Sequence, residues 1–173
     1  MALNAYIHDC KGRKQNDIKG SITQKGREGW IEIIAANHQI VSPRDAASGL
    51  ATGKRMHKPY TVTAPYDKAL PLFYSALVNN ETLTQIEFIF FSPTKLGERG
   101  SGQGVEEATY KVRLENAHIS DIQFRMPNNK NPELMKYENY YEISFTYQKI
   151  IGTWVNGGIT FEDDWEAPNQ NLG

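Results

Sequence analysis

The sequence lacks several features that mark common protein classes. Cys10 is the one cysteine among its 173 residues, so no disulfide can form within the chain. Lysine and arginine number 19, and aspartate and glutamate number 20, so the formal net charge of −1 gives no overall field toward nucleic acid or an anionic membrane. No apolar run approaches the ~20 residues that a membrane-spanning helix needs. These absences argue against nucleic acid and membranes as partners.

The N-terminal stretch, MALNAYIHDCKGRK, also lacks the order of a secretory signal peptide. Its apolar patch is short and precedes the basic residues, whereas a signal peptide has a basic segment followed by a longer apolar core. We therefore expect synthesis and folding in the cytoplasm, with any export by a route that needs no cleaved signal. A chain of this length can bury one good core, so residues 1–173 are predicted to form a single domain.

What the sequence does contain is mainly the two-residue period of β-strands. Strands are expected at AYIH (5–8), IKGSIT (18–23), 29–41, 58–64, 83–92, 108–126 and 140–150. Apolar positions change parity near Asn116 and again near Asp121, which predicts bulges or bends there. The last stretch alternates apolar and polar residues throughout, which is typical of an antiparallel sheet with one buried face.

One segment, DKALPLFYSALVNN (67–80), follows the helical period instead. Pro71 cannot lie deep inside a helix, so it is expected in the first turn, and Asn79 and Asn80 mark the end. A single helix among seven or eight strands predicts a mainly β fold. We expect an antiparallel two-sheet β-barrel or sandwich with one α-helix packed on its side.

Two long segments are rich in turn residues, 42–57 and 92–104. Loops of this length are usually functional or disordered. The first contains SGLATGKRMHK, whose glycine and lysine suggest a phosphate-binding loop. However, Ser48 stands where the motif needs its first glycine, and Arg55 where it needs serine or threonine. We therefore do not expect a nucleotide site.

No other pattern points to catalysis, a metal or a cofactor. The four histidines lack the spacing of metal ligands, and no serine lies in a strand–turn–helix elbow. Adjacent Asp163 and Asp164 near the chain end are more typical of a solvated turn than of a catalytic pair. We expect no enzymatic activity, no cofactor and no metal site.

The charges are unevenly distributed. Segment 42–58 carries Arg44, Lys54, Arg55 and Lys58 against a single acid, Asp45, whereas the C-terminal stretch carries Glu162, Asp163, Asp164 and Glu166. Two different patches of opposite charge allow head-to-tail self-association, which closes into rings or continues as filaments. Two separate solvated faces are the alternative, and charge alone favours it.

Four stretches, in order over nearly the whole chain, resemble the haemolysin-coregulated protein family, Hcp, which forms the tube of the bacterial type VI secretion system. They are IKGSITQKGREGWIEIIAANHQIVSP, TGKRMHKPYTVTAPYDKALPLFYSAL, YKVRLENAHISDI and YENYYEISFTYQKIIGTWVNGGITFEDDW. The most telling parts are the run Gly53–His57, the helix entry Asp67–Pro71, and Tyr-x-Lys-Ile ahead of GGI and DDW. The segment GERGSGQG is longer than is usual for the family.

The resemblance implies a structural role. Hexameric rings would stack into a tube that carries and stabilises small effector proteins in its lumen. The tube would work with sheath, baseplate and spike proteins, and leave the cell without a signal peptide. Segment 42–57 would be the family's extended loop, which contacts the neighbouring ring. We expect inter-ring contacts from Arg44, Lys54, Arg55 and His57, with the acidic counterpart at Glu162, Asp163 and Asp164.

Two alternatives stay open. A tail-tube subunit of a phage-like particle would share the architecture. A monomeric ligand-binding β-barrel would instead show a closed apolar cavity and the mass of one chain in solution.

Overall fold

The computed structural model describes residues 4–93 and 106–166, and strands make up most of this part. The strands are β1 (Ala5–Gly12), β2 (Asn16–Asp17), β3 (Ile31–Ile33), β4 (Ala35–Asn37), β5 (Ile40–Val41), β6 (Met56–His57), β7 (Tyr60–Pro65), β8 (Leu83–Pro93), β9 (Glu106–Arg125), β10 (Tyr140–Thr146), β11 (Lys149–Trp154) and β12 (Ile159–Asp164). One helix, α1 (Leu70–Val78), interrupts the strands of the described part. The predicted fold class, mainly β with antiparallel sheets and one helix, is confirmed.

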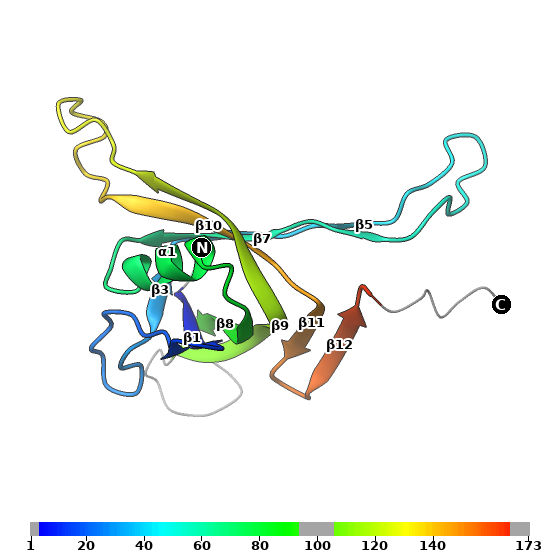
Figure 1. The fold of residues 1–173 in the computed structure, drawn as a ribbon, viewed down its shortest axis with the longest axis horizontal. Helices are drawn as coiled ribbons and strands as arrows, with labels where there is room; N and C mark the ends of the chain where they lie inside the picture. Colours follow the sequence, from blue (N-terminus) through cyan, green and yellow to red (C-terminus); the bar gives the residue numbers. More distant parts are fainter. Residues whose placement is uncertain (1–3, 94–105, 167–173) are drawn as a thin grey trace.

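Antiparallel pairing joins the strands in the order β2-β1-β8-β9-β10-β7-β4, with β11 between β9 and β12. The fold has two layers, and the 20 residues of β9 run through both. The first part of β9 pairs with β8 and β11 in one layer, and its last part pairs with β10 in the other (Figure 1). Both predicted irregularities are present. Asn116 has a φ of 49°, and the register with β10 shifts between Ile119 and Asp121.

The stretch 29–41, expected as one long strand, forms three short strands with different partners. β3 pairs with β1, and β4 pairs with β7 in the other layer. Between them Ile34 donates its backbone N–H to Thr63 O at 2.7 Å. This segment therefore joins the two layers opposite β9, and the chain then leaves the body as β5.

The strand predicted for IKGSIT was wrong. Residues 18–23 form an irregular segment with a bend at Ser21, in which Gly20 donates its backbone N–H to Gly29 O at 2.8 Å. A Cβ at Gly20 would lie 2.4 Å from Trp30 O, and Gly29 has a φ of 79°. Close backbone approach, which only glycine allows, thus replaces the expected ladder.

The core lies between the layers, and α1 packs against it. The helix includes Pro71 in its first turn and is followed by Asn79, both as predicted. Its Phe73 is fully buried, with its ring centroid 6.2 Å from that of Phe145 and 6.4 Å from that of Tyr141 on β10. Apolar burial on this scale stabilises the fold by roughly 2–3 kcal/mol for each large side chain.

Two segments project from the body in Figure 1: the β9–β10 connection, and residues 40–57, which we call the arm. The arm begins and ends with the β5–β6 ladder, in which Ile40 pairs with His57. Its tip is an ordered turn, because the hydroxyl and backbone N–H of Ser48 donate to the Asp45 carboxylate at 2.6 and 2.8 Å. Most of the second predicted loop, residues 94–104, lies outside the described residues.

Candidate interaction site at the base of the arm

The base of the arm is held to the β11–β12 hairpin by a guanidinium–carboxylate pair. Arg55, directly before β6, donates through Nε to Asp163 Oδ2 and through Nη2 to Asp163 Oδ1 at 2.7 Å. Nη2 also donates to the backbone oxygen of Asp164 at 2.9 Å. The planar fork of arginine matches a carboxylate in this two-point geometry. The neighbouring guanidinium lowers the pKa of Asp163 below its ordinary value, and the His57 contact adds to this effect.

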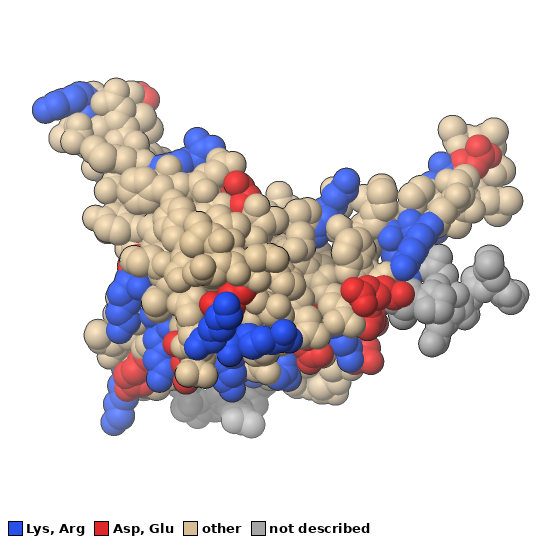
Figure 2. All heavy atoms as spheres, viewed as in Figure 1, with Lys and Arg blue, Asp and Glu red and all other residues tan. Residues whose placement is uncertain are grey.

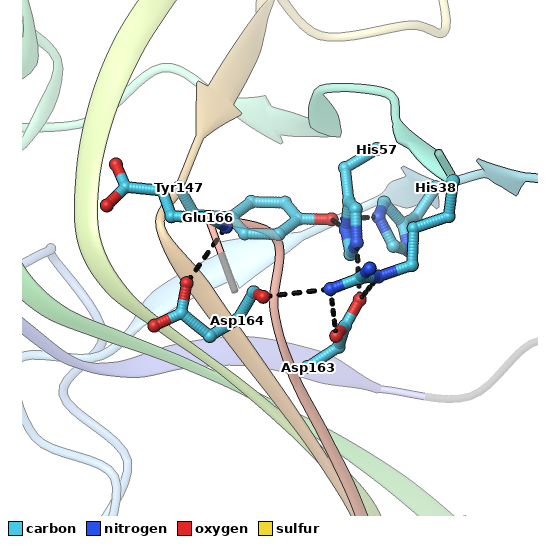
Figure 3. A network of polar contacts seen from close by, with 7 residues as sticks. His38, His57, Tyr147, Asp163, Asp164 and Glu166 are labelled. Carbon is cyan, nitrogen blue, oxygen red and sulfur yellow. Dashed lines mark hydrogen bonds and ion pairs between the residues drawn. The ribbon is translucent and has the colours of Figure 1, made fainter. Parts of the chain in front are cut away.

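Two histidines and a tyrosine extend this pair into the body (Figure 3). His57 Nε2 lies 2.7 Å from Asp163 Oδ2, and its Nδ1 lies 2.8 Å from the hydroxyl of Tyr147. The same hydroxyl lies 2.7 Å from Nε2 of His38, which precedes β5. The His57 side chain is 2% exposed. One hydroxyl of the body therefore contacts both the segment that enters the arm and the segment that leaves it.

Burial and neighbouring charge shape the protonation of this network. Burial, followed by the nearby His57, lowers the pKa of His38 from its ordinary value. Burial, followed by the negative charge of Asp163, raises the pKa of Tyr147. The hydroxyl therefore stays protonated, and the neutral form of His38 is favoured as its partner.

The structure brings some of the predicted site residues together and leaves others apart. Arg55 and His57 meet Asp163 within one chain, and Figure 2 shows basic and acidic side chains together where the arm leaves the body. Arg44 and Lys54 are exposed on the arm, and neither forms an ion pair with a residue that the structure describes.

The other two predicted acidic residues have partners of their own on the hairpin. Glu162 pairs with Lys149 at 3.4 Å. Asp164 accepts the backbone N–H of Glu166 at 3.0 Å and a side-chain N–H of Gln148 at 3.4 Å. The pairs of opposite charge that these acidic residues form in the structure therefore lie within one chain.

Sequence reasoning missed two members of the network, His38 and Tyr147. His38 was taken as part of a long strand. Tyr147 was placed on the buried face of its strand, and it is 4% exposed. A buried tyrosine nearly always needs a partner for its hydroxyl, so the alternation itself held a signal for a polar contact at this position.

Two apolar surfaces lie at different ends of the body. An open groove of about 900 Å³ lies beside the β9–β10 connection. Ile34, Phe124, Met126, Leu134 and Tyr137 are among its lining residues, and all are at least partly exposed. The β11–β12 hairpin presents the second surface, with exposed Trp154, Val155, Ile159 and Phe161. Figure 1 shows the β9–β10 connection and this hairpin on opposite sides of the fold.

The described part of the chain shows no further group suited to metal binding or thiol chemistry, and no helix suited to spanning a membrane. Its His, Cys, Asp and Glu residues form no group of three that could hold a metal ion, and its helix is neither long nor apolar enough to cross a membrane. Cys10 is buried, and burial raises the pKa of its thiol, which disfavours the reactive thiolate.

Comparison with known proteins identifies the family. Residues 11–154 match the family model described as type VI secretion system effector, Hcp. The chain belongs to the Hcp family. It is 36% identical to the major exported protein of Pseudomonas aeruginosa, over 97% of this chain and 98% of that protein. The resemblance stated from the sequence is confirmed.

Solved Hcp structures share the fold. The Hcp1 protein of the E. coli EAEC 042 pathovar, solved as a mutant, superposes with a TM-score of 0.79 at 28% identity, over 95% of this chain and 99% of that one. The secreted protein Hcp3 of Pseudomonas aeruginosa gives a TM-score of 0.71 at 29% identity, over 96% of this chain and all of that one. Both superpositions therefore extend over nearly the whole chain.

Proposed function

We propose that residues 1–173 form one tube domain of a type VI secretion system, that six copies form a ring, and that rings stack into a tube. The observation that carries this proposal is the pairing of Hcp membership with two different apolar surfaces on opposite sides of the fold. The role is structural rather than enzymatic. Small effector proteins would occupy the lumen, and sheath, baseplate and spike proteins would be the other partners.

The ring would form by head-to-tail contact between the groove and the β11–β12 hairpin. The groove is concave, whereas the hairpin turn is uncharged and presents exposed Trp154 and Ile159. Exposed apolar patches rimmed by polar residues commonly mark protein interfaces. Because the two surfaces differ, each subunit can bind one neighbour on each side, and such contacts close into rings.

The arm would make the contacts between rings. It extends away from the body and carries exposed Arg44, Lys54 and Leu50 (Figure 1). Arg55 and His57 would contribute by fixing the direction of the arm through Asp163. A single exposed ion pair is worth ~0–1 kcal/mol, but six symmetric copies act together in each ring. The tube would leave the cell by the secretion system's own route, as the name of the major exported protein suggests for that relative.

Light scattering after size exclusion tests the ring. We expect a mass near six subunits for the wild type and a mass of one subunit for Ile159→Asp, because a carboxylate would be buried in the groove. Val78→Asp is the matched control: Val78 is 77% exposed on α1 and belongs neither to the lining of the groove nor to the hairpin, so this variant should keep the ring. A monomeric wild type would contradict the proposal and favour the ligand-binding barrel.

A further inference from the structure

The hydroxyl of Tyr147 can hold only one proton between two imidazoles. Nδ1 of His57 and Nε2 of His38 lie 2.8 and 2.7 Å from its oxygen. Because His57 Nε2 faces a carboxylate oxygen of Asp163, that nitrogen carries a hydrogen. When both imidazoles are neutral, His38 donates to the hydroxyl, the hydroxyl donates to His57, and His57 donates to Asp163. Every donor then has an acceptor.

One added proton is also accommodated. A proton on Nδ1 of His57 makes that nitrogen a donor to Tyr147, and the hydroxyl turns to donate to Nε2 of His38. The new charge lies against Asp163, and all contacts remain satisfied with His38 as its Nδ1–H tautomer. A second proton has no place in this arrangement. Both imidazoles would then donate to one oxygen, the hydroxyl hydrogen would lose its acceptor, and two positive rings would face each other.

The surrounding groups keep their charge while the imidazoles titrate. Arg55 pairs with Asp163 on β12, and the pKa of that carboxyl lies below its ordinary range. Tyr60 on β7, whose ring centroid lies 5.1 Å from that of His38, has a pKa raised by burial, as does Tyr147. Between about pH 7.5 and pH 5, Asp163 therefore stays negative and both tyrosines stay neutral.

We propose that His38, His57 and Tyr147 form a proton-operated latch on the arm. While the two imidazoles are neutral, or carry one added proton between them, the latch holds the segments that enter and leave the arm against the body. Uptake of the second proton breaks the contact between His38 and Tyr147 and loosens the chain that enters β5. Arg55 continues to anchor the chain that leaves the arm, so acidification frees one side of its base. The effect on ring stacking rests on the proposed function, but the latch itself does not.

Amide hydrogen exchange of the arm base tests the latch in the full-length protein. The reporter is the amide of Lys58, which donates to Gln39 O at 3.0 Å, together with the β5–β6 ladder. After correction for intrinsic rates, we expect faster exchange at about pH 5 than at pH 7.5. The increase is at most about 30-fold. This limit holds if the closed arm takes up no second proton at all, while the open arm titrates a histidine with the ordinary pKa of about 6.5.

Three variants separate the latch from general acid sensitivity. His38→Gln keeps a neutral donor that does not titrate, so its arm should exchange equally at both pH values. Tyr147→Phe removes the shared oxygen and should speed exchange at both. His118→Gln removes a nearby histidine that contacts the hydroxyl of Thr82 at 3.0 Å rather than that of Tyr147, and it should keep the wild-type response. A wild-type response in His38→Gln, or no response in the wild type, would overturn the latch.

A second measurement needs no variant. Exchange of the imidazole Cε1 hydrogens, followed by mass spectrometry, reports the protonation of each histidine in an assembly of any size. We expect the two rings to become protonated together only at the pH where the arm loosens. Independent titration of the two rings would contradict the latch. Light scattering on the same samples reports the ring separately, so a monomeric protein with a working latch would sink only the proposed function.

Discussion

The base and the tip of the arm carry similar charges but use them differently. At the base, Arg55 is half-buried and bound at two points to a carboxylate from the far end of the chain. Towards the tip, Arg44 and Lys54 are exposed, and the one nearby acid, Asp45, is engaged by Ser48 within its own turn. The comparison shows that a basic loop can divide its charges between holding its own shape and meeting a partner.

The largest effect on stability is expected at Asp163. Asp163→Ala should lower the free energy of unfolding by about 1–3 kcal/mol, because it removes the carboxylate that the half-buried Arg55 and the buried His57 both contact. Urea unfolding measures this difference. Asp164→Ala is the matched control and should cost less, since its side chain contacts only a backbone N–H and a 3.4 Å amide among the described residues. Equal losses of unfolding free energy for the two variants would contradict a special stabilising role of Asp163 at the base of the arm.

The next effect is the dependence of stability on acid. Arg55, and to a lesser degree His57, lower the pKa of Asp163 in the folded protein, so the unfolded chain binds that proton more readily. This contribution is fully present above about pH 4 and is lost as the pH falls towards the lowered value. Asp163→Asn should therefore flatten the decline in unfolding free energy below about pH 4 relative to the wild type. Parallel curves for the two proteins would contradict the prediction.

The smallest effect on stability is expected towards the tip. Arg44→Glu with Lys54→Glu should change the free energy of unfolding by less than about 0.5 kcal/mol, since both side chains are exposed. The same double variant should keep its ring mass yet fail to form stacked tubes and to be secreted. Lys25→Glu with Lys68→Glu, an equal change of charge on exposed positions of the body, is the control. Normal secretion by the arm variant would end the inter-ring role of these residues.

A double change of Lys54 and Arg55 would blur this comparison. Arg55 belongs to the base, so its reversal places a carboxylate against Asp163 and disturbs the arm itself. Loss of secretion would then report a displaced arm as readily as a lost contact between rings. Separating Arg44 and Lys54 from Arg55 keeps the two effects apart.

Local patterns in the sequence predicted most of the fold. The alternation of residues 140–150 anticipated β10, although the one strand expected there ends at Thr146 and β11 begins at Lys149; Pro71 with Asn79 bracketed α1. The parity changes located the irregularities of β9 to within a residue or two. The failures were at IKGSIT and 29–41, where glycine contacts and a change of partner strand override β-propensity. Such effects depend on which segments pack against the strand in the folded protein, and the β-propensity of its residues carries no information about that.

The candidate site was anticipated by residue type but not by arrangement. Length, turn residues and basic charge marked the arm, and acidic residues marked the chain end. That Arg55 meets Asp163, 108 positions away, depends on the β11–β12 pairing and on the path of β6. The roles of His38 and Tyr147 were missed because a histidine on a strand and a tyrosine on a buried face have no distinctive pattern by themselves.

The sequence by itself determined the family, the mainly β composition, the helix that follows Asp67 and the presence of a long basic arm, because these follow from periodicity, turn chemistry and motif order along the chain. Tertiary structure decided which charged side chains pair within the chain and which remain exposed. The reason is geometric: the β5–β6 register and the link between β10 and β11 bring His38, His57 and Tyr147 within hydrogen-bonding distance, and no local rule encodes that meeting.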